Sequence, residues 1–265
     1  MDCELYFDVQ YRGDDEDYWK LDLALPASSR DEPAPCLVLV HGGGWRGCTK
    51  QSDMESKLMR HFAGRGYVAA SVEYRLTGVA PHPAQISDVM AAVRWLRTHA
   101  DEYGIDRESF AAAGHSAGGH LAALLGLLDY DGWREGSMPH ADVSCAVQAV
   151  VGLSGVYDLT EHIRQGTLTE ILLDLLPGPG SGLLERARAA SPATYVRAGA
   201  PPFLLMHGTE DPCCRLAQAE DMAERLSDAG AEDVTLRVVQ GAGHGLPIDT
   251  VKQEMDVFLE RVLRK

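Results

Sequence analysis

Three residues of the types that cooperate in nucleophilic catalysis occur along the sequence in the order Ser116, Asp211 and His244. A serine hydroxyl is a weak nucleophile near neutral pH and needs a neighbouring base to take its proton. A histidine can be that base, and a carboxylate can hold its imidazole in the required tautomer. The three residues therefore predict a serine hydrolase if the fold brings them together, with Asp158 as the main alternative for the acid.

Ser116 is the central residue of a G-x-S-x-G pattern at residues 114–118. The apolar run at 109–113 predicts a buried strand before it, and the run at 119–128 predicts a buried helix after it. A serine on such a strand-to-helix turn has strained backbone dihedrals, and its hydroxyl stands clear of the backbone. The following helix directs its first N–H groups and its positive dipole end toward a developing oxyanion. Taken alone, the motif leaves two interpretations open, a nucleophile and an incidental serine in a glycine-rich turn.

A glycine loop at residues 41–45, with the sequence HGGGW, is the second feature suited to chemistry. It follows the apolar run 36–40, which we interpret as a central strand. Three consecutive glycines let the backbone fold tightly and leave N–H groups unshielded, as an oxyanion hole requires. The loop is therefore a candidate oxyanion hole, and a merely flexible glycine loop is the alternative.

The elements that must position these residues follow from the hydrophobic pattern. Period-2 alternation at 5–9 and 19–25 predicts an N-terminal antiparallel hairpin. Further strands are expected at 67–72, 146–153, 203–206 and 234–239, and helices at 53–65, 84–100, 215–229 and 249–264. Alternating strands and helices predict an α/β fold, a mostly parallel sheet with helices on both faces. Loops after parallel strands open on one edge, so Ser116, Asp211 and His244 are expected to converge there. We interpret residues 1–265 as a single domain, with a short cap-like insertion at 159–195.

Bulk properties narrow the classes of partner and compartment. The chain has 265 residues and a formal net charge of −15, which argues against a nucleic-acid partner. No apolar run is long enough to span a membrane, and the start of the chain does not resemble a signal peptide. Six cysteines without C-x-x-C spacing predict free thiols in the cytoplasm. No cluster has metal-ligand spacing, so neither a metal nor another cofactor is expected. An exposed edge hairpin would permit a homodimer.

Several other polar residues lie near the predicted site. His41 is expected to brace the glycine loop, His120 to cap or pack, and His207 to order the turn that carries Asp211. Asp88 and Arg94 on the predicted helix at 84–100 are expected to form structural ion pairs. Four residues could line the substrate pocket but fit ordinary packing equally well: Trp45, Trp133, Tyr157 and His162.

These motifs resemble the α/β-hydrolase superfamily. The chain is similar to cap-poor esterases of the bacterial acetylxylan and feruloyl esterase type (BD-FAE-like) and to hormone-sensitive-lipase-like enzymes. The matching segments are 41–45, 73–76, 114–122, 191–196, 207–212 and 241–245. The resemblance implies Ser116 as nucleophile, Asp211 as acid and His244 as base. It also implies oxyanion donors at the N–H of Ala117 and of Gly43, Gly44 or Trp45. One departure is Cys213-Cys214, where relatives commonly have an apolar pair.

The activity that the resemblance implies is that of a serine carboxylesterase. Its substrate would be a short-chain acyl ester, acetyl-type, or an aromatic-acid ester of a sugar or small molecule, cleaved through an acyl-enzyme. An aryl formamidase similar to kynurenine formamidases, or a peptidase of the same fold, is the alternative. A non-catalytic, ligand-binding member of the superfamily is a third and more remote alternative.

Overall fold

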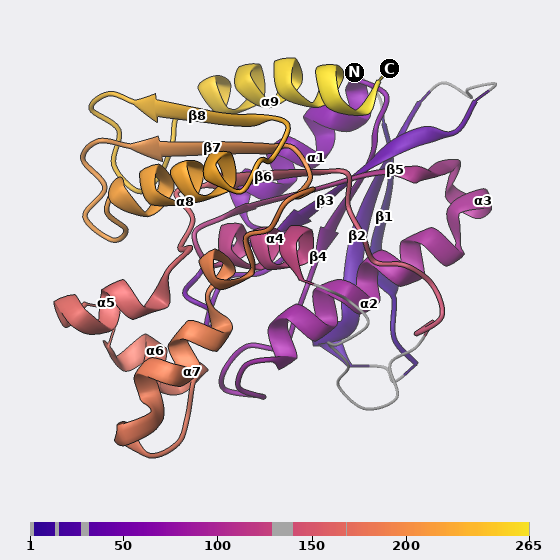
Figure 1. Cartoon of the computed structure of the whole chain (residues 1–265). Helices are drawn as coiled ribbons and strands as arrows, with labels where there is room; N and C mark the ends of the chain where they lie inside the picture. The colour runs from indigo at the N-terminus through magenta and orange to yellow at the C-terminus, as the bar shows by residue number, and fades with distance from the viewer. Residues whose placement is uncertain (1–2, 14–15, 28–31, 129–139, 168, 265) are drawn as a thin grey trace.

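The computed structural model describes residues 3–13, 16–27, 32–128, 140–167 and 169–264. Within these ranges eight strands form one sheet in the order β1-β2-β4-β3-β5-β6-β7-β8 (Figure 1). The strands are β1 (Cys3–Gln10), β2 (Lys20–Pro26), β3 (Ala34–Val40), β4 (Val68–Val72), β5 (Ile105–His115), β6 (Ala149–Leu153), β7 (Phe203–Gly208) and β8 (Val234–Val239). The α-helices are α1 (Asp53–Gly64), α2 (Ala84–Thr98), α3 (Ala100–Tyr103), α4 (Ala117–Leu127), α5 (Leu159–Gln165), α6 (Thr169–Leu175), α7 (Leu183–Ala190), α8 (Ala217–Asp228) and α9 (Ile248–Leu263).

Strand direction confirms the predicted fold class. β2 pairs antiparallel with both β1 and β4, and every other neighbouring pair is parallel. The sheet is therefore mostly parallel, with an antiparallel hairpin at the N-terminus as predicted. Because β3 to β8 run in one direction, the loops after β3, β5, β7 and β8 open on the same edge of the sheet.

Helices cover both faces of the sheet, and each face has its own hydrophobic core. Phe62 of α1 and Phe258 of α9 belong to one core, while Leu121 of α4 and Met222 of α8 belong to the other. All residues of β3 are buried, and alternate ones face opposite cores. This double burial explains why the strand reads as a continuous apolar run rather than an alternating one.

The start of β5 differs from the sequence-based expectation. The strand begins at Ile105, whereas the apolar run predicted a start at residue 109. Residues 107 and 108 are exposed, so their polar side chains carry no hydrophobic signal. The extension begins where Ala34 of β3 pairs with Ile105.

Asp88 ties the N-terminal hairpin to α2, as expected of a structural ion pair. Its buried carboxylate accepts hydrogen bonds from Arg75 Nε at 2.8 Å and Trp19 Nε1 at 3.0 Å, and Arg12 lies at 3.3 Å. Arg94 donates to the carbonyl of Val143 at 2.9 Å. These contacts assign both residues of α2 to the framework of the fold.

Helices α5, α6 and α7 lie together at the lower left of Figure 1, away from the strands. Asp174 of α6 forms an ion pair with Arg46 at 3.2 Å, and the carbonyl of Leu175 accepts the N–H of His82 at 2.9 Å. A Cβ on Gly44 would lie 3.4 Å from Ile171 Cδ1. The segment predicted as a cap-like insertion therefore contacts the glycine loop through α6.

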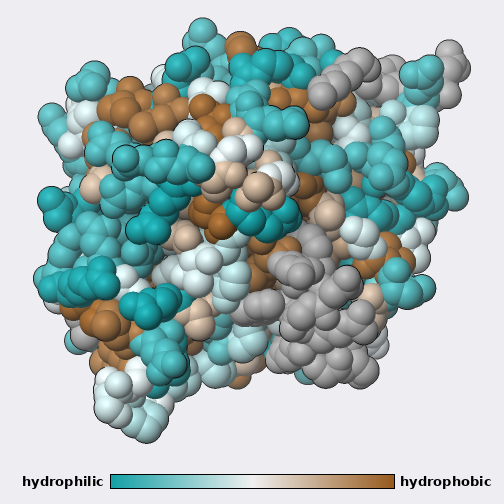
Figure 2. Space-filling view, in the orientation of Figure 1, coloured by the Kyte–Doolittle hydropathy of each residue, from teal (hydrophilic) through white to brown (hydrophobic). Residues whose placement is uncertain are grey.

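The surface on the side shown in Figure 2 is mainly hydrophilic, with hydrophobic atoms in separate patches. Large exposed apolar side chains include Tyr6 and Phe7 on the edge strand β1 and Val238 on the opposite edge strand β8. Within the described part of the chain, no helix has both the length and the apolar character needed to cross a membrane.

Candidate active site

Ser116 lies in the sharp turn between β5 and α4. Its backbone has φ of 55° and ψ of −116°, a conformation that is costly for a residue with a side chain. A Cβ on Gly118 would overlap the carbonyl oxygen of Val40, so only glycine fits where the turn meets β3. The N–H of Ser116 donates to the carbonyl of Leu153 at 2.8 Å, which fixes the turn to β6. The serine is thus held in the geometry predicted from G-x-S-x-G.

The glycine loop lies beside this turn. Gly43, Gly44 and Trp45 all have positive φ, at 98°, 61° and 57°. Among the residues that the structure describes, no oxygen accepts a hydrogen bond from the N–H of these three. The loop and Ser116 line the same cavity, which has a volume of about 350 Å³. Together with the first N–H groups of α4, including that of Ala117, the loop offers unpaired donors to a negative oxygen.

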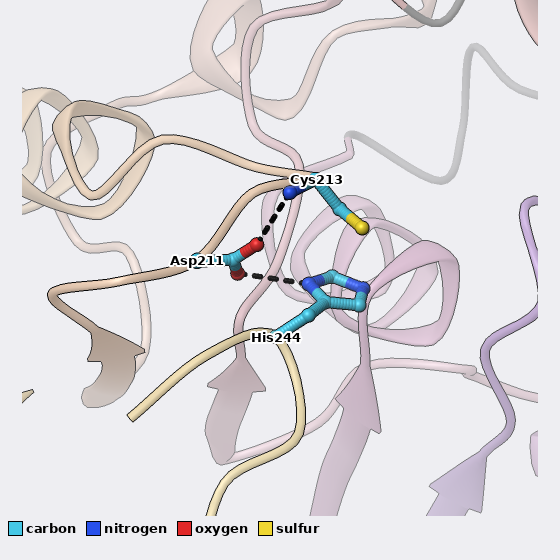
Figure 3. A group of neighbouring side chains, drawn as sticks. All are labelled: Asp211, Cys213 and His244. Carbon is cyan, nitrogen blue, oxygen red and sulfur yellow. Dashed lines mark hydrogen bonds and ion pairs between the residues drawn. The ribbon is translucent and has the colours of Figure 1, made fainter. Parts of the chain in front are cut away.

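His244 lines this cavity and lies beside Asp211 (Figure 3). His244 Nδ1 lies 2.8 Å from Asp211 Oδ2, while Asp211 Oδ1 accepts the N–H of Cys213 at 2.8 Å and of Cys214 at 2.9 Å. Burial alone would raise the pKa of Asp211, but the hydrogen bonds from Cys214, His244 and Cys213 outweigh it and lower that pKa. The carboxylate is therefore ionised and oriented toward the imidazole.

Hydrogen bonds between two loops set this pair in place. Asp211 follows β7 and His244 follows β8. The N–H of Thr209 donates to the carbonyl of Val239 at 3.1 Å, and the N–H of Glu210 donates to the carbonyl of Ala242 at 2.9 Å. The loop after β7 is thus fastened to the loop after β8 within a few residues of both side chains.

His207 also contacts the carboxylate of Asp211. Its Nε2 lies 2.9 Å from the carbonyl oxygen of Cys214 and 3.2 Å from Asp211 Oδ2. Burial lowers the pKa of His207, which favours a neutral ring. This histidine orders the turn that carries Asp211, as expected.

His115 is a residue of the site whose role the sequence analysis did not assign. Its Nε2 donates to the carbonyl of His244 at 2.8 Å, and the centroids of the two rings are 4.7 Å apart. Burial lowers the pKa of His115, so the ring is neutral near pH 7. The only sequence signal was its place in the G-x-S-x-G pattern, beside the serine.

The remaining alternatives have structural roles. His41 Nε2 lies 2.9 Å from Glu73 Oε1, and its ring stacks on Tyr74, bracing the start of the glycine loop. His120 Nε2 donates to the carbonyl of Ala190 at 2.8 Å in a fully buried position. Asp158 caps α5 by accepting the N–H of Thr160 at 2.9 Å. The geometry thus pairs His244 with Asp211 and uses Asp158 elsewhere.

Of the four aromatic or histidine residues considered for the pocket wall, Trp45 lines the cavity. Tyr157 and His162 are buried and are not part of its described wall. Trp133 lies outside the described residues. Cys213 and Cys214, the pair noted as a departure from the family pattern, both border the cavity.

Asp211, Cys213 and His244 form the one group within the described ranges that could hold a metal ion, with ligand atoms within 4.8 Å of one another (Figure 3). Both oxygens of Asp211 already accept hydrogen bonds. The ligand atoms that remain are Cys213 Sγ and His244 Nε2, the ring nitrogen that faces away from Asp211. A metal bound between them would occupy that nitrogen.

Comparison with known proteins identifies the family of the chain. The BD-FAE family profile matches residues 21–226. The chain is 35% identical over 230 residues to esterase LipC of Mycobacterium tuberculosis, a match that covers 82% of this chain and 54% of LipC. A match to esterase LipQ of the same organism, 34% identical, covers 84% of this chain and 53% of LipQ. The chain therefore spans about half the length of these relatives.

Solved structures agree with this assignment. A truncated carbohydrate esterase from gut microbiota superposes with a TM-score of 0.86 at 25% identity, covering 99% of this chain and 97% of that one. Butyrate-bound esterase Est2 of Thermogutta terrifontis superposes with a TM-score of 0.79 at 28% identity, covering 98% and 94%. The fold is that of the α/β-hydrolase esterases, and the chain belongs to the BD-FAE family.

Proposed function

We propose that the chain is a serine carboxylesterase that cleaves short-chain, acetyl-type or aromatic-acid esters of a sugar or small molecule. One observation carries the proposal: His244, paired with Asp211 at 2.8 Å, borders the same cavity as the strained Ser116. Esterase relatives such as LipC support it.

In the acylation step, Ser116 Oγ attacks the ester carbonyl carbon. His244 takes the serine proton through Nε2, the ring nitrogen that Asp211 does not engage, and Asp211 stabilises the imidazolium. The N–H groups of Ala117 and of the glycine loop donate to the oxyanion of the tetrahedral intermediate. When that intermediate collapses, His244 returns the proton to the leaving alkoxide, and an acyl group remains on Ser116.

Deacylation repeats these roles with water as the nucleophile. His244 removes a proton from water as it attacks the acyl carbonyl, and the same N–H groups stabilise the second oxyanion. Collapse of the intermediate returns the proton to Ser116 Oγ and releases the carboxylic acid. These proposed reaction steps require no metal and no organic cofactor.

The size and walls of the cavity support a small substrate. A volume of about 350 Å³ lies at the lower end of small-molecule sites, and Val156 and Ile171 provide apolar walls. The structural relatives include a carbohydrate esterase and a butyrate-bound esterase, which is consistent with short acyl groups.

The test is hydrolysis of p-nitrophenyl acetate and butyrate by the wild type and Ser116→Ala. We expect turnover by the wild type and a fall in kcat on the order of 10⁶ in the variant. Acetylated xylo-oligosaccharide and an aryl formamide, assayed in parallel, separate ester from amide preference. Equal rates for the two proteins would contradict the proposal.

A further inference from the structure

Glu55 is a buried acid that borders the cavity without any part in the steps above. It lies in the first turn of α1, its exposed fraction is 5%, and it lines the same cavity as Ser116 and His244. Acidic side chains are rarely this buried unless something is paired with them. The buried carboxylate of Glu55 is therefore expected to have a hydrogen-bond donor or a cation beside it.

No such partner is present among the residues that the structure describes. No side chain or backbone N–H of another described residue donates to the Glu55 carboxylate, and no described Lys, Arg or His forms an ion pair with it. Burial raises the pKa of Glu55, and the opposing influences come from its own backbone N–H and from the electrostatic effect of nearby His41. The carboxylate is thus only partly compensated by the protein itself.

Glu55 does not form a capping box with Ser52. Ser52 and Glu55 have the S-x-x-E spacing of a capping box, in which the glutamate returns to the N–H of the serine. Here the N–H of Ser52 instead donates to the carbonyl of Thr49 at 3.0 Å. The capping box is therefore not formed, and the carboxylate interacts with the N–H of Glu55 itself in the first turn of α1.

The other side chains around it make the carboxylate distinctive. Met54 from the same helix, with Val156 and Ile171, gives the cavity apolar walls. A carboxylate beside such apolar walls discriminates strongly, because a bound group without a donor leaves it desolvated and unpaired.

We propose that Glu55 accepts a hydrogen bond from a hydroxyl group of the bound ester, so that the chain prefers neutral hydroxylated esters over their deoxy analogues. This inference rests on the proposed esterase function and names its substrate class. A carboxylate group on the substrate would be repelled by Glu55, which is why the proposed substrates are neutral esters.

Two matched substrate pairs test the inference. Glycerol monoacetate and propyl acetate differ in hydroxyl groups on the alcohol side, and methyl lactate and methyl propanoate differ in one on the acyl side. In at least one pair, the wild type should favour the hydroxylated member in kcat/KM by about 10- to 100-fold, as expected for a hydrogen bond to a charged acceptor. The pair that shows the preference identifies the side of the ester that Glu55 contacts.

Variants at position 55 connect the preference to the carboxylate. Glu55→Met should abolish it, and the isosteric Glu55→Gln, which keeps a neutral acceptor, should retain part of it. Asp53→Asn is the matched control, because Asp53 lies in the same turn but is exposed and paired with Lys57 at 2.6 Å. That control should leave the ratio unchanged.

The outcomes separate this inference from the proposed function. Lack of preference in both pairs, or a ratio that survives in Glu55→Met and Glu55→Gln, would overturn the role of Glu55 while ester hydrolysis persists. Absence of Ser116-dependent turnover of p-nitrophenyl acetate would instead reject the esterase function itself.

Discussion

His115 Nε2 lies 2.8 Å from the backbone carbonyl oxygen of His244, a contact between residues 129 positions apart in the sequence. It joins the nucleophile turn directly to the loop that carries the proposed base. Small displacements of a catalytic group are costly, since about 1 Å can reduce the rate by 10²-fold. We therefore predict a positioning role for His115.

Replacing His115 tests that role. His115→Phe removes the donor but keeps a ring, and we expect kcat on p-nitrophenyl acetate to fall about tenfold with little change in KM, the loss of one hydrogen bond. His115→Gln retains a donor and should recover most of the rate. Equal activity of His115→Phe and the wild type would show that the contact does not position His244.

The pairing of acid and base predicts a ranking of two aspartates. Asp211→Asn should lower kcat by about 10⁴, because the amide no longer stabilises the required tautomer and imidazolium of His244. Asp158→Ala should leave kcat within a few-fold and lower the free energy of unfolding by about 1 kcal/mol, because it removes the cap of α5. Steady-state kinetics and chemical denaturation of both variants measure the two effects. The reverse ranking would reassign the acid.

The cluster of Asp211, Cys213 and His244 predicts inhibition by soft divalent cations. Thiolate and imidazole are preferred ligands of zinc, and binding between Cys213 and His244 would block the nitrogen that takes the serine proton in the proposed mechanism. We expect Zn²⁺ or Cd²⁺ to inhibit ester hydrolysis reversibly, with recovery on adding a chelator. Burial and the charge of Asp211 raise the pKa of Cys213, so the inhibition should strengthen as the pH rises.

Single-cysteine variants provide the control for metal inhibition. Cys213→Ser should raise the half-inhibitory concentration at least about tenfold, because losing even a residue that supports a metal ligand costs about 10- to 100-fold in affinity. Cys48 also borders the cavity and is exposed, but it is outside the cluster, so Cys48→Ser should behave as the wild type. The same inhibition in all three proteins would place the metal elsewhere.

The sequence predicted those parts of the fold whose signals are local. The apolar run of β3, the alternation in the N-terminal hairpin and the G-x-S-x-G turn each identify an element from neighbouring residues alone. β8 has the predicted bounds, Val234–Val239. By contrast, the polar start of β5 carries no hydrophobic pattern, so its first residues were not predicted.

The roles that sequence reasoning missed depend on contacts between distant segments. His115 acquires its role from a carbonyl in the loop after β8, and no local pattern encodes that partner. Glu55 has the spacing of a capping box, so its position beside the cavity becomes evident only in three dimensions. Local sequence thus specified residue types and turns, whereas the supporting contacts required the fold.

A final prediction concerns stability rather than activity. Burial lowers the pKa of His120 to about 3, and its ring packs edge-on against Trp45 with centroids 5.0 Å apart. The unfolded chain would protonate this histidine near pH 6.5. Below that pH the unfolded state binds a proton that the folded state does not, so the free energy of unfolding falls as the pH falls. One such group contributes up to about 1.4 kcal/mol per pH unit.

Guanidinium denaturation at several pH values between about 7 and 5 measures this slope. His120→Gln keeps a donor for the carbonyl of Ala190 but cannot titrate. Its free energy of unfolding should therefore decline less steeply than that of the wild type, by about 1 kcal/mol per pH unit. Parallel slopes in the two proteins would mean that His120 is protonated equally in the folded and unfolded states. In that case, burial against Trp45 would not be what makes the fold sensitive to acid.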